Sequence, residues 1–238
     1  MDRDGNLYAG CGPEGIVYRV RSDGQGRVEA YFDTRDSNVL SLAMDSGGKL
    51  LAATGGKGRI FRIDEPGRAR VIHDFEDREV RSITIREDVV YAATNMADEA
   101  PGTSGESSGK ATEFSTLGRN LARKFQGFEF IQGNPADDEP GSSRMNLNIP
   151  AGSRGGEVVV LHPDGRVQTL HEIHEGFLMD LAMDGIGNLY VGLGYEGRVI
   201  SLGENGQWTL LSSTSGALVS TLAAGATGLK FAACSTRG

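Results

Sequence analysis

Polar side chains that could recognise a ligand gather just before three of the chain's apolar runs, with one more, Asp180, inside the third run. They combine an amide, a guanidinium, an imidazole and three carboxylates: Asn38, Arg78, Glu79, His174, Glu175 and Asp180. Carboxylate oxygens are ligands that Ca²⁺ accepts, so Glu79, Glu175 and Asp180 are also the candidates for a metal site. No G-x-S-x-G, phosphate-binding loop or Cys/His pair accompanies them, and we assign no catalytic residue. We predict no cofactor, with a divalent cation such as calcium as the alternative.

The histidines and cysteines do not form a metal-binding pattern. His171 and His174 are three residues apart, which on a helix could chelate a metal, but the sequence here favours a strand leading into a loop. Side chains three apart on a strand face opposite sides. Cys11 and Cys234 form no C-x-x-C, and we interpret both as small buried strand residues.

The candidate residues occupy fixed places in an internal repeat of about 41 residues. One strand-like run returns five times, with an aromatic or leucine residue at the same place in each copy: Tyr8, Leu51, Tyr91, Tyr190 and Phe231. Each unit holds four short β runs separated by Asp, Gly and Asn turns, which is typical of a β-propeller blade. One blade cannot bury both of its faces, so neighbours must stack. We predict an all-β chain of about 4.5 blades of four antiparallel strands, in a partial or open ring.

The repeat also gives the predicted domain organisation. Residues 1–95 hold the first two blades and part of the third, residues 96–155 are an insertion, and residues 156–238 hold the rest of the third blade through an incomplete fifth. The first blade lacks its first strand and the fifth its last two. We expect a piece of a longer propeller, with a closed five-bladed ring carrying a redundant strand as the alternative. Uncovered blade faces would favour a homo-oligomer.

The insertion is predicted to be largely disordered, because its flanks are rich in Gly, Ser, Pro and acidic residues. One stretch inside it has apolar residues at helical spacing: Phe114, Leu117, Leu121, Phe125 and Phe128. Three interpretations remain open: a helix that docks a partner or a membrane surface, a helix that folds back on the propeller, or no stable structure.

The first two strands of a unit follow the pattern LA-x-D-x-x-G-x-LY-A/V-G, and the third begins G-x-V-Y-R. This pattern resembles the NHL, SMP-30/gluconolactonase-like and related bacterial propeller repeats. In propellers, the loops between blades share one face with the loops between strands two and three, and ligands bind there. The resemblance to the SMP-30 group implies a divalent metal held on this face, for which Asn38, Glu79, Glu175 and Asp180 are the candidates by region.

Asp180 is unusual within the repeat, since its equivalents are Ser41, Ser82 and Thr221. A carboxylate at such an inner position needs a partner or a raised pKa. Two interpretations remain open: hydrogen bonding to the neighbouring strands, or contact with a ligand or metal. The Asp-x-x-Gly segments, as at Asp184–Gly187, look like calcium loops, but they lack the trailing Glu and are interpreted as turns.

Charge and hydropathy exclude some partners. The net charge of −8 argues against nucleic acid as a partner, and no apolar run is long enough to cross a bilayer. Both cytoplasmic and exported locations stay open. We predict a non-catalytic propeller module that binds a protein or small-molecule ligand at the channel mouth, possessing no independent activity if it is a fragment. The alternative is a metal-dependent SMP-30/gluconolactonase-like hydrolase or a propeller lyase, which stoichiometric binding of a divalent cation would favour.

Overall fold

The structure is a computed structural model of the 238-residue chain, and it describes residues 1–76, 78–96, 155–174, 176–194, 197–215 and 217–236. Over these residues the secondary structure is entirely strand and turn, with no helix. By their contacts, the described residues fall in one compact unit. The predicted helix around residues 114–128 lies outside the described residues.

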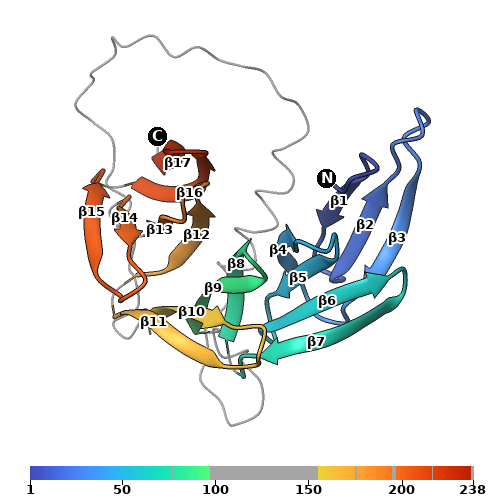
Figure 1. The fold of residues 1–238 in the computed structure, drawn as a ribbon, viewed down its shortest axis with the longest axis horizontal. Helices are drawn as coiled ribbons and strands as arrows, with labels where there is room; N and C mark the ends of the chain where they lie inside the picture. Colours follow the sequence, from blue (N-terminus) through green and yellow to red (C-terminus); the bar gives the residue numbers. More distant parts are fainter. Residues whose placement is uncertain (77, 97–154, 175, 195–196, 216, 237–238) are drawn as a thin grey trace, which may run out of the picture. The chain divides into compact units, whose positions relative to one another are not determined.

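The strands form five antiparallel sheets in chain order, here called sheets 1 to 5 (Figure 1). Sheet 1 comprises β1 (Leu7–Gly10), β2 (Ile16–Val20) and β3 (Val28–Asp33). Sheet 2 comprises β4 (Val39–Met44), β5 (Leu50–Thr54), β6 (Arg59–Glu65) and β7 (Arg68–Asp74). Sheet 3 comprises β8 (Arg78–Arg86), β9 (Val89–Met96), β10 (Gly156–Leu161) and β11 (Val167–Ile173).

Sheet 4 comprises β12 (Leu178–Met183), β13 (Leu189–Leu193), β14 (Val199–Leu202) and β15 (Trp208–Ser212). Sheet 5 comprises β16 (Ala217–Gly225) and β17 (Gly228–Thr236). The prediction of an all-β partial propeller is therefore confirmed. Sheets 2, 3 and 4 are complete four-stranded blades, while sheet 1 has three strands and sheet 5 has two. In sheet 3, β9 pairs directly with β10 across the insertion, with Asn95 opposite Gly156.

The hydrophobic core lies between the sheets. We call the side of a sheet that packs on the preceding sheet its front face, and the side that packs on the following sheet its back face. Leu51 and Ile60 on the back face of sheet 2 join Val80 and Val90 on the front face of sheet 3 in one buried cluster. Three similar clusters join sheets 1 and 2, sheets 3 and 4, and sheets 4 and 5. Burial on both faces explains why β5 and β13 are buried along their whole length and are apolar except for Thr54.

Close approach of the sheets depends on small residues in the second strands. A Cβ on Gly10 of β1 would lie 2.5 Å from a methyl of Val39 in the next sheet. Likewise, a Cβ on Gly192 of β13 would lie 2.6 Å from a methyl of Val219 in sheet 5. In both places the glycine leaves room for the first valine of the following inner strand, so the repeat positions specify contact between blades.

Each first strand contains a β-bulge at the same repeat position. The pairing register shifts between Val39 and Ser41 in β4, and again at the equivalent places in β8, β12 and β16. A bulge adds an unpaired residue and redirects the side chain and N–H groups that follow it. The residues just after the four bulges are Ser41, Ser82, Asp180 and Thr221.

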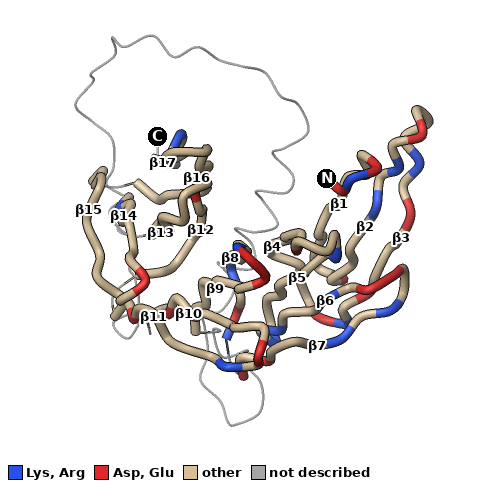
Figure 2. Tube along the Cα trace, in the orientation of Figure 1, with Lys and Arg blue, Asp and Glu red and all other residues tan. Residues whose placement is uncertain are grey.

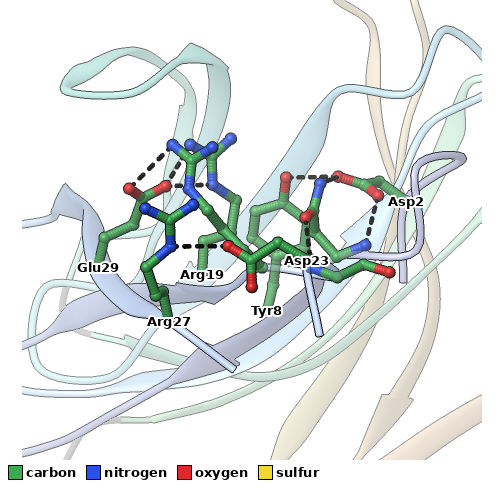
Figure 3. A network of polar contacts seen from close by, with 9 residues as sticks. Asp2, Tyr8, Arg19, Asp23, Arg27 and Glu29 are labelled. Atoms are coloured by element: carbon green, nitrogen blue, oxygen red, sulfur yellow. Dashed lines mark hydrogen bonds and ion pairs between the residues drawn. The ribbon is translucent and has the colours of Figure 1, made fainter. Parts of the chain in front are cut away.

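In sheets 1 and 4, a single aspartate holds the turn before the second strand of the blade. The Asp184 carboxylate accepts bonds from the Asn188 N–H at 2.8 Å, from the Asn188 amide at 2.8 Å and from the Tyr190 hydroxyl at 3.1 Å. Burial acts to raise the pKa of Asp184, but these hydrogen bonds outweigh it and keep the pKa below its ordinary value. Asp2 repeats the arrangement with Asn6 and Tyr8 (Figure 3). The oxygens of this motif are thus occupied by the turn itself.

Candidate functional site

Arg78 and Glu157 form an ion pair at one end of sheet 3. Arg78 is the first residue of β8, directly after the loop from sheet 2, and Glu157 lies at the start of β10. Their Nη2 and Oε1 atoms are 2.5 Å apart, and the two side chains are 22% and 24% exposed. The other terminal nitrogen of Arg78, Nη1, is buried and has no hydrogen-bond partner among the described residues. Because a buried guanidinium N–H without an acceptor is costly, an oxygen that reached this atom after movement of the side chains covering it would be stabilised.

A small pocket of about 180 Å³ adjoins this pair. Its walls come from the ends of β8 to β11 and the residues beside them: Arg78, Met96, Gly155, Gly156, Glu157, Glu172, Ile173 and His174. Gly156 allows β10 to lie close to β9, because a Cβ there would lie 2.7 Å from the Asn95 side-chain oxygen and 2.7 Å from the Thr94 carbonyl oxygen. A larger hollow of about 310 Å³ lies at the opposite strand ends of sheet 1, where Asp23 and Arg27 bond each other at 2.7 Å (Figure 3).

Behind the pocket, Asn95 connects sheet 3 to sheet 4. Its amide donates to the Leu178 carbonyl at 2.9 Å and accepts from the Leu178 N–H at 2.8 Å. The same amide nitrogen donates to Glu79 Oε1 at 3.0 Å. Asn95 is 1% exposed, so it fixes the first residue of β12 in place and orients the Glu79 carboxylate beside the Arg78 end of β8.

Sheet 2 has the same kind of ion pair with the charges exchanged. Asp36, in the loop before β4, approaches Arg59 at the start of β6, with Oδ1 and Nη2 3.0 Å apart. The Thr54 hydroxyl donates to Asp36 at 2.8 Å. Arg59 and Glu157 were not among the predicted site residues. The signal was present in the sequence, since each directly follows the glycine before a third strand, Gly58 or Gly156.

Asp180 lies deeper on its strand and connects three sheets. Its Oδ1 accepts a bond from the Ser82 hydroxyl of sheet 3 at 2.7 Å. Its Oδ2 accepts bonds from the Thr221 hydroxyl at 3.0 Å and the Leu222 N–H at 2.8 Å, both in sheet 5. Ser82 in turn accepts from the Leu181 N–H at 3.1 Å. The hydrogen-bonding interpretation of this residue therefore has a geometric basis, with both carboxylate oxygens engaged.

The remaining predicted residues do not form one cluster. His174 lines the same pocket as Arg78, whereas Asn38 lies beside the first sheets, where its amide donates to the Ser37 hydroxyl at 3.2 Å. Glu175 lies outside the described residues. Burial, followed by the nearby His174 charge, lowers the pKa of His171. The His171 ring packs against Trp208 with centroids 6.4 Å apart.

No group of three His, Cys, Asp or Glu side chains suited to hold a metal occurs in the described part of the chain. The described residues also contain no helix that could span a membrane. The charged side chains of Arg78 and Glu157 beside the pocket offer hydrogen-bonding groups, which suit binding of a polar group.

No protein-family profile and no curated protein matches the chain by sequence. Solved structures do resemble it. A streptogramin B lyase superposes with a TM-score of 0.58 at 11% identity, over 96% of this chain and 58% of the lyase. Virginiamycin B lyase from Staphylococcus aureus superposes with a TM-score of 0.55 at 12% identity, over 94% of this chain and 57% of the lyase. The extracellular domain of a putative hybrid two-component system from B. thetaiotaomicron superposes with a TM-score of 0.54 at 10% identity, over 93% of this chain and 24% of that domain's chain.

These similarities extend over nearly all of this chain, which spans less than two thirds of each of these neighbours. At 10–12% identity they concern the fold alone. Together with the four-stranded antiparallel sheets and the cores between them, they establish that the chain has the architecture of a partial β-propeller.

Proposed function

We propose that this chain is a non-catalytic propeller module that binds a peptide or a small amide-bearing molecule at the Arg78 pocket. The observation that carries the proposal is the Arg78 guanidinium in the pocket wall, whose buried Nη1 has no partner among the described residues. A ligand that displaces the side chains covering Nη1 would place an oxygen acceptor on it and complete the hydrogen bonding of the guanidinium without breaking its ion pair with Glu157. Arginine presents five donors in a fixed fork, so one side chain can hold a structural and a ligand acceptor together.

The charges around Arg78 favour a neutral acceptor over an anion. Glu157 already neutralises the guanidinium, and Glu172 adds a second carboxylate to the pocket wall. An incoming carboxylate would meet repulsion from both. A peptide carbonyl carries no net charge, and the adjoining N–H of a peptide unit can donate to a carboxylate. The ligand chemistry that fits is therefore an extended or turn segment with exposed peptide groups, or a small molecule with the same amide.

The test is an NMR titration of the ¹⁵N-labelled chain with N-acetylglycinamide, with acetate as the anionic comparison. We expect shifts of the Arg78 side chain and of Gly156 with the amide, and smaller ones with acetate. Arg78→Lys keeps the positive charge beside Glu157 but removes Nη1, so it should abolish the shifts at Gly156. Arg68→Lys is the matched control, since it makes the same substitution at an arginine that is 77% exposed in sheet 2. Equal shifts in wild type and Arg78→Lys, or none in wild type, would refute the proposal.

A further inference from the structure

The front face of sheet 1 is apolar and uncovered. Tyr8 packs on sheet 2, so its strand neighbour Leu7 points to the opposite, front side. Leu7 pairs with Val20, which in turn pairs with Val28, and the three side chains share this side. Leu7 is 53% exposed and Val28 is 63% exposed. At the same repeat position in sheet 2, Leu50 is only 5% exposed, because sheet 1 covers it.

The back face of sheet 5 is also apolar and uncovered. Leu222 packs on sheet 4, so Ala223 points to the back side, and Phe231 is its cross-strand partner. Phe231 is 74% exposed. Its equivalent in sheet 4, Tyr190, is 7% exposed because sheet 5 lies over it. Cys234 on the same strand is exposed as well, which corrects the prediction that it is buried; β17 has no third strand beside it among the described residues.

The four internal interfaces show what covers such faces. In every case a back face with a leucine or tyrosine in the second strand packs on a front face with apolar first- and second-strand residues. Sheet 1 lacks a first strand and sheet 5 lacks a third strand among the described residues, so the two uncovered faces are a shortened front face and a shortened back face. Both are exposed in the same structure, so they do not cover each other within one chain. Sheet 5 is nearly uncharged, with Lys230 its one charged side chain over Ala217–Thr236 (Figure 2), which suits an apolar partner.

We propose that the back face of sheet 5 in one copy packs on the front face of sheet 1 in a second copy, head to tail. The contact would continue the sheet-on-sheet packing that the chain repeats four times. It is heterologous, so copies can add in an open chain or close into a ring. Two or three short strands offer about 300–400 Å² per copy from strand spacing and rise, below the roughly 800 Å² typical of stable interfaces. The association is therefore weak and depends on concentration.

The experiment is sedimentation velocity from about 5 μM to about 500 μM, a range chosen for a weak interface. Wild type should sediment faster as its concentration rises. Leu7→Lys blocks the front face and Phe231→Lys blocks the back face, so each variant alone should remain monomeric. Mixed in equal amounts, they should form a 1:1 dimer and nothing larger, because each retains the face that the other has lost. Ile186→Lys changes an equally exposed residue, 64%, in a turn of sheet 4 and should associate as wild type does.

Three outcomes would overturn the proposal. Wild type could remain monomeric over the whole range. Leu7→Lys could self-associate undiminished, which would indicate contact between two back faces. The mixed variants could fail to form a dimer. Urea unfolding of both variants checks folding, and it should match wild type because Leu7 and Phe231 are mostly exposed in the monomer.

Discussion

Replacement of Asp180 should reveal how much the hydrogen bonds between blades contribute to stability. The carboxylate takes bonds from Ser82 in sheet 3 and from Thr221 and Leu222 in sheet 5. Asp180→Ala removes all of these acceptors at once. Asp180→Ser is the matched variant, because serine stands at this repeat position in sheets 2 and 3. There the Ser41 and Ser82 hydroxyls accept an N–H from the following sheet at 3.1 Å.

The magnitude follows from which donors lose their acceptor. The Leu222 N–H is partly buried, and leaving such a donor unsatisfied costs about 1–3 kcal/mol. The Ser82 hydroxyl is 4% exposed and adds about 0.5–1.5 kcal/mol. Thr221 is exposed, so water replaces its bond. Asp180→Ala should therefore lose about 3 kcal/mol, or ~6–12 °C in Tm for a chain of this size. Asp180→Ser should lose about 1 kcal/mol, since its hydroxyl can accept from Leu222.

The assay is urea unfolding followed by Trp208 fluorescence and by circular dichroism. Trp208 lies in β15 of the same sheet as Asp180, and agreement of the two probes tests for a single cooperative transition. The reasoning is refuted if Asp180→Ala is as stable as Asp180→Ser, because the acceptor would then contribute nothing. Separation of the two transitions in Asp180→Ala alone would instead show that this residue couples the sheets.

Two further predictions concern the blade interfaces and the Asp turns. Leu50→Ala should lose about 2–5 kcal/mol of unfolding free energy, because Leu50 is 5% exposed. Leu7 stands at the equivalent position but is 53% exposed, so Leu7→Ala should lose under about 1 kcal/mol at low protein concentration. Equal losses in urea unfolding would contradict the assignment of the core to the contacts between sheets. Burial, together with the hydrogen bond to Asp2, raises the pKa of Tyr8 to about 12. A raised folded pKa gives stability that is complete below the unfolded value near 10 and is lost as pH rises through the folded value. The difference in urea midpoint between wild type and Tyr8→Phe should therefore shrink from pH 10 to 12, and a constant difference would show that the hydroxyl bond does not contribute.

The strand count of every sheet could be predicted from the sequence, because short local patterns of apolar and turn residues identify each strand of the blade repeat. Glycine or aspartate lies at or beside the turns, and short apolar runs lie between them. The equivalence of Tyr8, Leu51 and Tyr190 fixed which residues share a place in the fold. The bulge after Val39 and its three equivalents could not be predicted, since a one-residue register shift depends on packing against the next sheet and leaves no distinct residue type.

The candidate site was only partly predictable for a related reason. Arg78 and Glu79 stand out as charges at a strand start, but their partners Glu157 and Asn95 lie 79 and 16 residues away along the chain. The Arg78–Glu157 pair depends on β10 joining β9 across the insertion, and the Glu79–Asn95 contact depends on the register between β8 and β9. The sequence shows that Asp180 is a carboxylate where the other units have a hydroxyl. It does not show the three partners of this carboxylate in the neighbouring sheets, because these contacts depend on how the blades stack.

The two ion pairs show that one contact within a blade can be built with either order of charge. In sheet 2 the acidic partner, Asp36, comes from the loop before the first strand and the arginine, Arg59, from the third strand. In sheet 3 the arginine, Arg78, is the first residue of the first strand and the acid, Glu157, lies in the third strand. Each pair ties the start of a blade to its third strand, so either order can hold a blade together. In sheet 3 the guanidinium also borders a pocket, with its buried Nη1 lacking a partner among the described residues, and this is where we propose that a ligand binds.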